Sequence, residues 1–353
     1  MPRPVLLDVS ALADARRSAG IGRYVEELAA ALGRLEELHV HRHLPPRPPH
    51  ESWVARYAWN QPFLAAAYRR GRPALVHGMA GEASLVVPPR RQVVTVHDIF
   101  PWEDRAARDP VTREYLRLQR GLLARCAALL AVSRATADAL VHDLGVGPER
   151  VHVVPEGVGA AFRPGRGEPP AGLARRGYLA WAGSMRAHDP RKALDSLVEA
   201  AAAGELPLVL AGRTGTESER LAKSAARLGV DVRLTGFLPD PELAQLYEHA
   251  AAVVFPSLRE GFGLPVLEAL ASGALVVATR TGAIPDFATG AAILVPPGDG
   301  AALTDAVRRA MAAGADVVAL REAAAGSASG YTWERTARAT AEIYRRLLTE
   351  PAG

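Results

Sequence analysis

The sequence predicts an α/β protein with two Rossmann-like domains, each built on a doubly wound parallel sheet. Apolar runs of strand length alternate with longer helical patterns along almost the whole chain, which is typical of parallel βαβ units. The chain has 353 residues, enough for two domains of about 150–200 residues each. Between Phe162 and Gly177 lies a stretch rich in Pro, Gly and Arg, which we interpret as the linker between the two domains.

The expected strands are short apolar runs, each followed by a turn or helix signal. In the first domain they are Val5–Val9, Ala74–His77, Gln92–Val96, Leu129–Val132 and Val151–Val154. In the second domain they are Tyr178–Ala182, Leu208–Ala211, Val232–Leu234, Ala252–Phe255, Leu275–Ala278 and Ala292–Val295. An amphipathic helix is expected from Trp333 to Leu348. We therefore place the domains at 1–165 and 166–330, followed by a last helical segment at 331–353.

Composition excludes several classes of protein. The formal net charge of +4 is small for this length, so it does not indicate a nucleic-acid partner, although it favours acidic ligands or an anionic membrane surface. Cys126 is the only cysteine, which excludes a disulfide framework or a cysteine metal site. The start of the chain lacks a signal-peptide pattern, and no apolar run reaches the roughly 18 residues of a membrane-spanning helix. We expect a cytoplasmic protein and leave peripheral contact at the inner membrane face open.

The segment from His41 to His50 is rich in histidine, proline and arginine. Clustered imidazoles suggest a metal site, but carboxylate partners are missing from this segment. We predict a solvated loop there and no bound metal ion.

The segment from Glu260 to Glu268 carries the strongest functional signal. A buried-strand pattern precedes it, a helix pattern follows it, and Pro265 suits the first helical turn. A strand, a glycine loop and a helix start direct backbone N–H groups and the positive end of a helix dipole at an anion. Glu260 and Glu268 add acceptors for hydroxyl groups, so the segment suits a phosphorylated sugar.

Paired glycines occur near the N-terminus, where Ser18 to Tyr24 leads into a helix predicted from Val25 to Leu32. Gly20 and Gly22 would let the backbone approach a ligand closely. The pattern partly resembles a dinucleotide fingerprint, but it lies about ten residues after its strand and lacks a third glycine. A plain loop and helix start is the alternative.

A polar pair, His97 and Asp98, follows the strand Gln92–Val96. Ligands of open α/β sheets gather at the carboxyl ends of strands, so this pair faces a predicted site. A structural hydrogen bond is the other interpretation.

Two cations follow the first strand of the second domain. Gly183 and Ser184 begin a loop, and Arg191 and Lys192 stand where the next helix is predicted to begin. A guanidinium fork and an ammonium suit a diphosphate. A solvated pair of charges is the alternative, although the helix dipole disfavours cations at a helix start. Further along, Gly236, Phe237 and Leu238 form a predicted loop that suits a nucleobase.

Together these segments resemble glycosyltransferase family 4, a family of retaining enzymes with the GT-B fold, in which two Rossmann-like domains face each other across a cleft. The resemblance covers nearly the whole chain in the expected order. It includes Gly20–Tyr24, Val96–Asp98, Val132–Arg134, Val153–Val158, the basic motif Pro190–Lys192, and the Glu260–Glu268 signature.

The resemblance implies a role for each matching position. Glu268 would bind the ribose of a nucleotide diphosphate sugar, and Glu260 would hold the transferred sugar with backbone groups at Gly261, Phe262, Gly263 and Leu264. Arg191 and Lys192 would bind the diphosphate, aided by backbone N–H groups of Gly20 to Gly22. His97 would lie near the donor sugar and the acceptor. The C-terminal helix would cross back onto the first domain.

Two positions depart from the family pattern. Relatives often have a basic residue directly after Gly183, where this chain has Ser184, which leaves open whether Ser184 or Arg186 replaces the usual basic contact to the diphosphate. Glu156 stands where relatives often have asparagine.

The predicted activity is metal-independent transfer of a hexosyl group to a hydroxyl acceptor, with no cofactor. GDP-mannose is the favoured donor, and a glycan, a lipid-linked intermediate or a small natural product is the acceptor. A sugar-nucleotide epimerase, a non-catalytic nucleotide-sugar binding protein and a nicotinamide oxidoreductase remain as alternatives.

Overall fold

The computed structural model describes residues 4–14, 20–49, 52–103, 109–165, 167–312 and 314–349. The chain divides into two units, and each is described by itself. One contains Met1–Gly157 and Thr332–Gly353, and the other contains Val158–Tyr331. The division therefore falls at 157/158, whereas the sequence analysis placed the boundary at 165/166. The linker segment Phe162–Gly177 lies within the second unit.

The first unit is built on a parallel six-stranded sheet with the order β2-β1-β3-β4-β5-β6. Five of its strands are the predicted runs. The strands are β1 (Val5–Asp8), β2 (Val40–His43), β3 (Leu75–Gly78), β4 (Gln92–Val96), β5 (Ala128–Ala131) and β6 (Val151–Val153). The direction of strand succession reverses between β1 and β3, which makes the sheet doubly wound.

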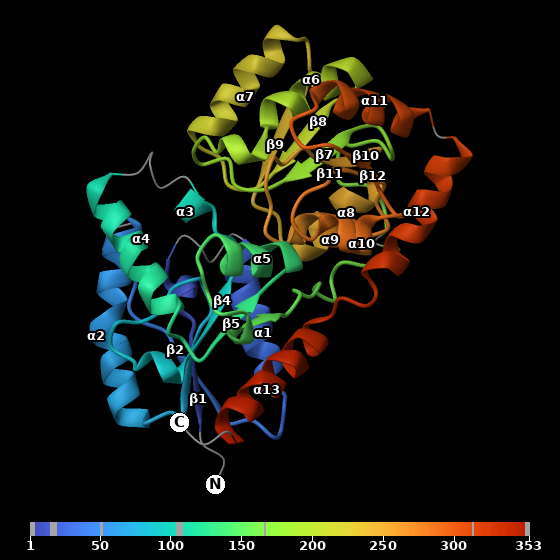
Figure 1. Cartoon of the computed structure of the whole chain (residues 1–353). Coiled ribbons are helices and arrows are strands. Elements are labelled where there is room, and N and C mark those ends of the chain that lie inside the picture. Colours follow the sequence, from blue (N-terminus) through green and yellow to red (C-terminus); the bar gives the residue numbers. More distant parts are fainter. Residues whose placement is uncertain are drawn as a thin grey trace. The chain divides into compact units, whose positions relative to one another are not determined.

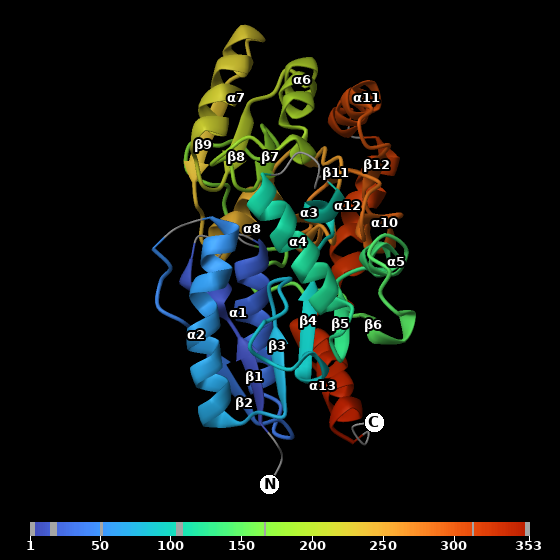
Figure 2. The same cartoon turned by 60° about the vertical axis from the view of Figure 1, so that its left-hand side comes forward.

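Helices cover both faces of this sheet (Figures 1 and 2). They are α1 (Gly20–Gly33), α2 (Trp53–Gly71), α3 (Phe100–Glu103), α4 (Pro110–Leu123), α5 (Arg134–His142) and α13 (Trp333–Thr349). α1 packs against α13 on one face, and α2 packs against α4 on the other. The last helix thus belongs to the first unit.

Strand β2 is a correction to the predicted solvated loop at His41 to His50. His41 and His43 lie in this strand, which pairs with β1 at the sheet edge. His43 is buried, and its Nε2 lies 3.0 Å from Oδ1 of Asn60. An edge strand needs one partner only and can be polar, so its pattern does not show the apolar run of a central strand. His50 lies outside the described residues.

Helix α1 begins earlier than predicted. The sequence predicts a loop from Gly20 to Tyr24 before a helix at Val25, but the helix already includes Gly20. The helix pattern was hidden because glycine is a weak helix former. Ser18 and Ala19 of the predicted loop lie outside the described residues.

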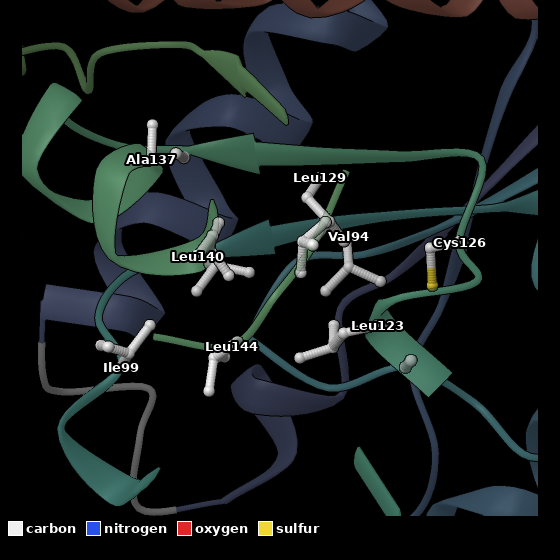
Figure 3. Packing of buried hydrophobic residues seen from close by; sticks show 12 residues of the cluster. Val94, Ile99, Leu123, Cys126, Leu129, Ala137, Leu140 and Leu144 are labelled. Atoms are coloured by element: carbon white, nitrogen blue, oxygen red, sulfur yellow. The ribbon is translucent and has the colours of Figure 1, made fainter. Parts of the chain in front are cut away.

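A hydrophobic cluster holds the sheet of the first unit to its helices (Figure 3). Val94 of β4 and Leu129 of β5 meet Leu123 of α4 and Leu140 of α5, all with no exposed surface. Cys126 is 1% exposed in the same cluster, and burial raises the pKa of its thiol to about 12. This cysteine is therefore a core residue. The cluster fixes the carboxyl ends of β4 and β5, where His97 and Ser133 follow.

The second unit contains another parallel six-stranded sheet, with the order β12-β11-β10-β7-β8-β9. All of its strands correspond to predicted runs, with ends shifted by at most two residues. They are β7 (Leu179–Ala182), β8 (Leu208–Ala211), β9 (Val232–Gly236), β10 (Ala252–Phe255), β11 (Val276–Thr279) and β12 (Ile293–Val295). Here the direction of strand succession reverses between β7 and β10, which are neighbours in the sheet. The segment with Arg191 and Lys192 follows β7, and the Glu260–Glu268 signature follows β10.

The helices of the second unit form two groups. They are α6 (Leu194–Gly204), α7 (Thr216–Arg227), α8 (Asp240–His249), α9 (Leu264–Ala271), α10 (Ile284–Ala288), α11 (Gly300–Met311) and α12 (Ala315–Ala328). α6 packs against α7 and α11, whereas α9 packs against α8, α10 and α12. None of the helices among the described residues has the length and apolar character needed to cross a membrane.

Candidate functional site

The loops after β7 and β10 form the candidate site of the second unit. In a doubly wound sheet, the carboxyl ends of the strands on either side of the reversal leave a crevice where ligands bind. Gly183 and Ser184 follow β7, and Ser257 to Gly263 follow β10. The sheet order therefore brings together segments about 75 residues apart in the sequence.

Arg191 and Lys192 lie in a short 3₁₀ turn, Pro190–Lys192, and not in the predicted helix start. Asp189 caps this turn by accepting a hydrogen bond from the backbone N–H of Arg191 at 3.2 Å. Ala193 then takes a left-handed conformation with φ 46°, and α6 begins at Leu194. The two cations are thereby separated from the α6 dipole, which removes the conflict that a cation at a helix N-terminus would create.

The turn contacts both neighbouring loops. The Lys192 ammonium donates a hydrogen bond to the backbone carbonyl of Ser184 at 2.5 Å. The same ammonium lies 5.7 Å from the ring centroid of Trp181, within cation–π range. The backbone N–H of Leu258 donates to the carbonyl of Arg191 at 2.6 Å. Lys192, Ser184 and the Glu260 loop are therefore parts of one cluster.

Burial and charge act in opposite directions on Lys192. Burial lowers the pKa of this lysine below its usual value, and the negative charges of Asp189 and Glu260 oppose that shift without cancelling it. Lys192 therefore loses its proton more readily than an exposed lysine. Glu260 thus lies close enough to Lys192 for their charges to interact.

Asp189 is a site residue that was not among those predicted. Its carboxylate accepts two hydrogen bonds from the Arg191 guanidinium, at 3.0 Å from Nε and 2.9 Å from Nη2. Burial would raise the pKa of Asp189, but the contacts with Arg191 outweigh it and lower the pKa. The Asp-Pro pair before the turn was the available signal, because Asp is a favoured cap before a proline-initiated turn.

Glu260 is held by side chains from two loops. Ser257 Oγ donates to Glu260 Oε1 at 2.7 Å, and the backbone N–H of Glu260 donates to Thr281 Oγ1 at 3.3 Å. Thr279 Oγ1 donates to the Ser257 carbonyl at 2.5 Å. The loop after β10 is thus fixed by residues at the end of β11, which orients the Glu260 carboxylate without a ligand.

The glycines around this loop have specific steric roles. Gly263 is the N-cap residue of α9 with φ 92°, a conformation that disfavours other residues. Gly282 has φ 58°, and a Cβ there would clash with the Glu260 carbonyl oxygen. Its backbone therefore packs directly under the Glu260 loop. Pro265 lies in the first turn of α9, as predicted.

The remaining predicted residues near α9 are mostly buried. Phe262 is 4% exposed and its ring packs against Phe287 and Tyr331, so its side chain belongs to the core. Glu268 is 2% exposed within α9. The ribose contact predicted for Glu268 stays a prediction.

Phe237 and Leu238 follow β9, at the opposite edge of the sheet from β12. Phe237 is 57% exposed. Leu238 lines a cavity of about 340 Å³ with Leu173, Thr235, Glu242 and Leu246, which Phe237 does not line. The predicted nucleobase contact of the two residues stays a prediction.

Ser184 and Arg186 differ in what they offer the site. Ser184 presents its carbonyl to Lys192. Arg186 uses its carbonyl to accept a hydrogen bond from the backbone N–H of Thr216 at 3.1 Å, and its side chain is exposed. The loop is anchored between them by Met185, which is fully buried.

Gly20, Gly22 and His97 lie in the first unit. Gly20 and Gly22 are in the first turn of α1. His97 follows β4, and its Nδ1 lies 3.2 Å from Glu156 Oε1. Tyr24, two residues after Gly22, stacks edge-on against the His97 ring with centroids 4.6 Å apart. Tyr24 thus connects the first turn of α1 to His97 within the first unit.

Metal binding has no support in the side-chain geometry of the part of the chain that the structure describes. There, no group of three or more His, Cys, Asp and Glu side chains is arranged to hold a metal ion. The predicted independence from metal and cofactor stays a prediction.

Two family models match the chain over most of its length. Residues 18–162 match the model described as Glycosyltransferase Family 4, and residues 176–313 match Glycosyl transferases group 1. The two matches correspond closely to the two units.

Curated relatives carry related names. The MMP alpha-(1->4)-mannosyltransferase of Mycolicibacterium hassiacum is 32% identical over 69% of this chain and 61% of its own length. The serotype-specific mannosyltransferase WbdA of Escherichia coli is 28% identical over 74% of this chain, which spans 34% of that protein. The D-inositol 3-phosphate glycosyltransferase 1 of Catenulispora acidiphila is 30% identical over 97% of this chain and 91% of its own length.

Solved structures share the fold. Sucrose-phosphate synthase from Thermosynechococcus elongatus has a TM-score of 0.80 and 20% identity, covering 98% of this chain and 99% of that one. The Anabaena protein HepE, solved with UDP and glucose, has a TM-score of 0.75 and 19% identity, covering 98% and 100%. With two doubly wound sheets, the Glu260–Glu268 signature and these matches in agreement, the chain has the GT-B fold and belongs to glycosyltransferase family 4.

Proposed function

We propose that this chain is a retaining glycosyltransferase that moves a hexosyl group from a nucleotide diphosphate sugar to a hydroxyl acceptor without a metal ion. The observation that carries the proposal is the cluster of Ser184, Arg191, Lys192 and Glu260 at the strand reversal of the second unit. It combines fixed cations for a diphosphate with a fixed carboxylate for sugar hydroxyls. GDP-mannose is the favoured hexosyl donor, supported by relatives named as mannosyltransferases.

Lys192 and Arg191 are assigned to the donor diphosphate. Lys192 is oriented by the Ser184 carbonyl and the Trp181 ring, so its remaining N–H groups are preorganised. Arg191 is oriented by Asp189 through two of its N–H groups. Fixed donors of this kind stabilise the charge that develops on a leaving group without reorganisation during the reaction.

Glu260 and Glu268 are assigned to hydroxyl groups of the donor. Glu260, with backbone N–H groups of Gly261 to Leu264, would hold the transferred sugar, and Glu268 would bind the ribose. Phe237 and Leu238 would lie beside the nucleobase. Gly20 and Gly22 would offer backbone N–H groups to the diphosphate from the first turn of α1.

The transfer step exchanges one C–O bond for another on the same face of the sugar. The bond between the anomeric carbon and the diphosphate oxygen breaks, and the acceptor oxygen forms a bond to that carbon. The proton of the acceptor hydroxyl passes to the leaving diphosphate, so no external base is consumed. Lys192 and Arg191 would stabilise the diphosphate while its charge grows.

A thermal-shift panel tests this proposal and identifies the donor. The intact chain is heated with GDP-mannose, UDP-glucose, UDP-N-acetylglucosamine and ADP-glucose, each with and without EDTA, and with NADH as a comparison. A ligand at 100 times its Kd stabilises the folded state by about 2.7 kcal/mol, so one nucleotide sugar should raise the Tm in EDTA. Stabilisation by NADH and by none of the sugars would contradict the proposal.

A further inference from the structure

The contact between His97 and Glu156 is a feature that the donor site does not account for. Each ring nitrogen of His97 faces an oxygen. Nδ1 lies 3.2 Å from Glu156 Oε1, and Nε2 lies 3.0 Å from the backbone carbonyl of Met79. A carbonyl can only accept, so Nε2 carries a proton. A carboxylate only accepts when it is ionised, so Nδ1 carries a proton whenever Glu156 is ionised.

The surroundings of His97 favour the charged ring. Burial would lower the pKa of His97, but the hydrogen bond and charge of Glu156, together with the Met79 carbonyl and Asp98, outweigh it and raise the pKa. The side chains of His97 and Glu156 are only 12% and 7% exposed, so bulk water screens their attraction weakly.

Besides Asp98, whose charge supports the imidazolium, Tyr24 and His77 lie near the pair, and neither of these two supplies a competing charge near neutral pH. Tyr24 of α1 presents its ring edge-on, and burial raises the pKa of its phenol far above the usual value. His77 of β3 is fully buried, and burial together with the His97 charge lowers its pKa to about 3. His77 is therefore neutral where His97 is charged.

The position of Glu156 is set by the C-terminal helix. Thr336 of α13 donates from Oγ1 to the backbone carbonyl of Pro155 at 2.8 Å. Trp333, also in α13, packs against the Tyr24 ring that contacts His97. α13 thus fixes the segment that carries Glu156 on one side and supports the histidine through Tyr24 on the other.

His97 also lines a cavity within the first unit. The cavity has a volume of about 90 Å³, and its walls include Asp98, Trp53, Trp102 and Tyr115. A ligand that reaches this cavity meets a ring whose two nitrogens are already used as donors. The histidine can then offer positive charge, but it has no lone pair to take a proton.

We propose that Glu156 is a positioning residue that holds His97 as an imidazolium, so that His97 serves as a fixed cation and not as a proton acceptor. The charge of His97 depends only on residues of the first unit, whereas its effect on sugar transfer rests on the proposed function. An acceptor hydroxyl must then deliver its proton to another group, as the proposed passage to the diphosphate requires. An asparagine at position 156 would offer no carboxylate to Nδ1 of His97.

The charge state can be read directly by ¹⁵N NMR of histidine side chains in the intact chain without ligands. In the wild type, both His97 nitrogens should show protonated signals at neutral pH, with a titration midpoint above the usual value of about 6.5. In Glu156→Gln the midpoint should fall below that value, because burial then acts without the carboxylate. Glu149→Gln, at an exposed position of the same unit, should leave the His97 midpoint unchanged.

A single protonated nitrogen on wild-type His97 at neutral pH would overturn the proposal, even if Glu156→Gln does not fold. An unchanged midpoint in a folded Glu156→Gln variant would overturn it as well. A fall of the midpoint in both variants would show that the effect is not specific to Glu156. These outcomes are independent of whether the chain transfers a sugar.

The consequence for transfer is tested with the donor found in the panel, by measuring kcat/KM against pH. Glu156→Gln should be impaired at neutral pH and should recover towards lower pH, where the His97 ring regains its proton. A merely structural defect would reduce kcat/KM equally at every pH. That result, with a lowered His97 midpoint, would overturn the role of the cation and leave the proposed function standing.

Discussion

Lys192 shows at the scale of one residue what sequence can and cannot predict. The sequence has two lysines, Lys192 and Lys223, and the motif context favoured the first as a ligand of phosphate. The contacts that orient it were not predictable, because Ser184 and Trp181 reach it only through the backbone path of the loop after β7. The 3₁₀ turn was also missed, since it depends on the left-handed Ala193.

Replacing the Lys192 ammonium should impair the chemical step. Lys192→Met keeps the length and the apolar stem but removes the charge that stabilises the leaving diphosphate. Loss of one preorganised donor typically lowers kcat by about 10²- to 10³-fold, and we expect a decrease of this order in single-turnover measurements with saturating donor.

Lys223→Met is the matched control, because Lys223 is exposed on α7 and should tolerate the same change with normal turnover. The lowered pKa of Lys192 adds a second readout. Wild-type activity should decline on the alkaline side at a pH below the pKa of an ordinary lysine, and Lys192→Arg should move this decline to higher pH. Normal turnover in Lys192→Met would remove the lysine from the mechanism.

At the scale of elements, strand ends and loops were predicted better than the contacts between them. The strand, glycine loop and helix around α9 follow from Gly263 and Pro265. The support from Thr281 and Gly282 was not visible, because it comes from the loop after the neighbouring strand, β11. Strand β2 was missed for a related reason, since only its pairing with β1 reveals it.

Gly282→Ala should disturb donor binding through the backbone of the Glu260 loop. The new Cβ would collide with the Glu260 carbonyl oxygen, so the loop must move. We expect the Kd for the donor to rise at least about tenfold, which corresponds to roughly 1.4 kcal/mol, as measured by calorimetry.

Gly290→Ala controls for backbone strain. Gly290 has φ 80°, and a Cβ there meets no atom within 4 Å. Both variants therefore force alanine into a left-handed conformation, at a cost of about 1–2 kcal/mol, but only one displaces the loop. Equal donor affinities for the two variants would show that Gly282 does not support the site.

At the scale of the whole molecule, the alternating pattern predicted two doubly wound sheets, and the structure confirms them. The pattern could not predict that the first unit ends at Gly157 and takes in α13 from the far end of the chain. That connection depends on tertiary contacts such as Thr336 with Pro155. The sequence resemblance supplied the expectation that the last helix returns to the first domain.

The proposed donor residues are distributed unevenly over the two units. Glu260, Glu268, Arg191 and Lys192 are in the second unit, whereas His97 with Glu156 is in the first. The second unit should therefore dominate donor affinity, and the first should act mainly on the transfer step. Glu268 gives the most direct test of this division, because its proposed role, binding the ribose, concerns the donor alone.

The central claim is tested most directly by calorimetric titration of the intact chain with the nucleotide diphosphate sugar selected in the panel. Glu268→Gln preserves the shape of the buried side chain, and Glu219→Gln makes the same change at an exposed position of α7. Hydrogen bonds to a charged group contribute about 1.5–3 kcal/mol. We therefore predict a Kd about 10- to 100-fold higher for Glu268→Gln and an unchanged Kd for Glu219→Gln; equal affinity of wild type and a folded Glu268→Gln variant would contradict the account.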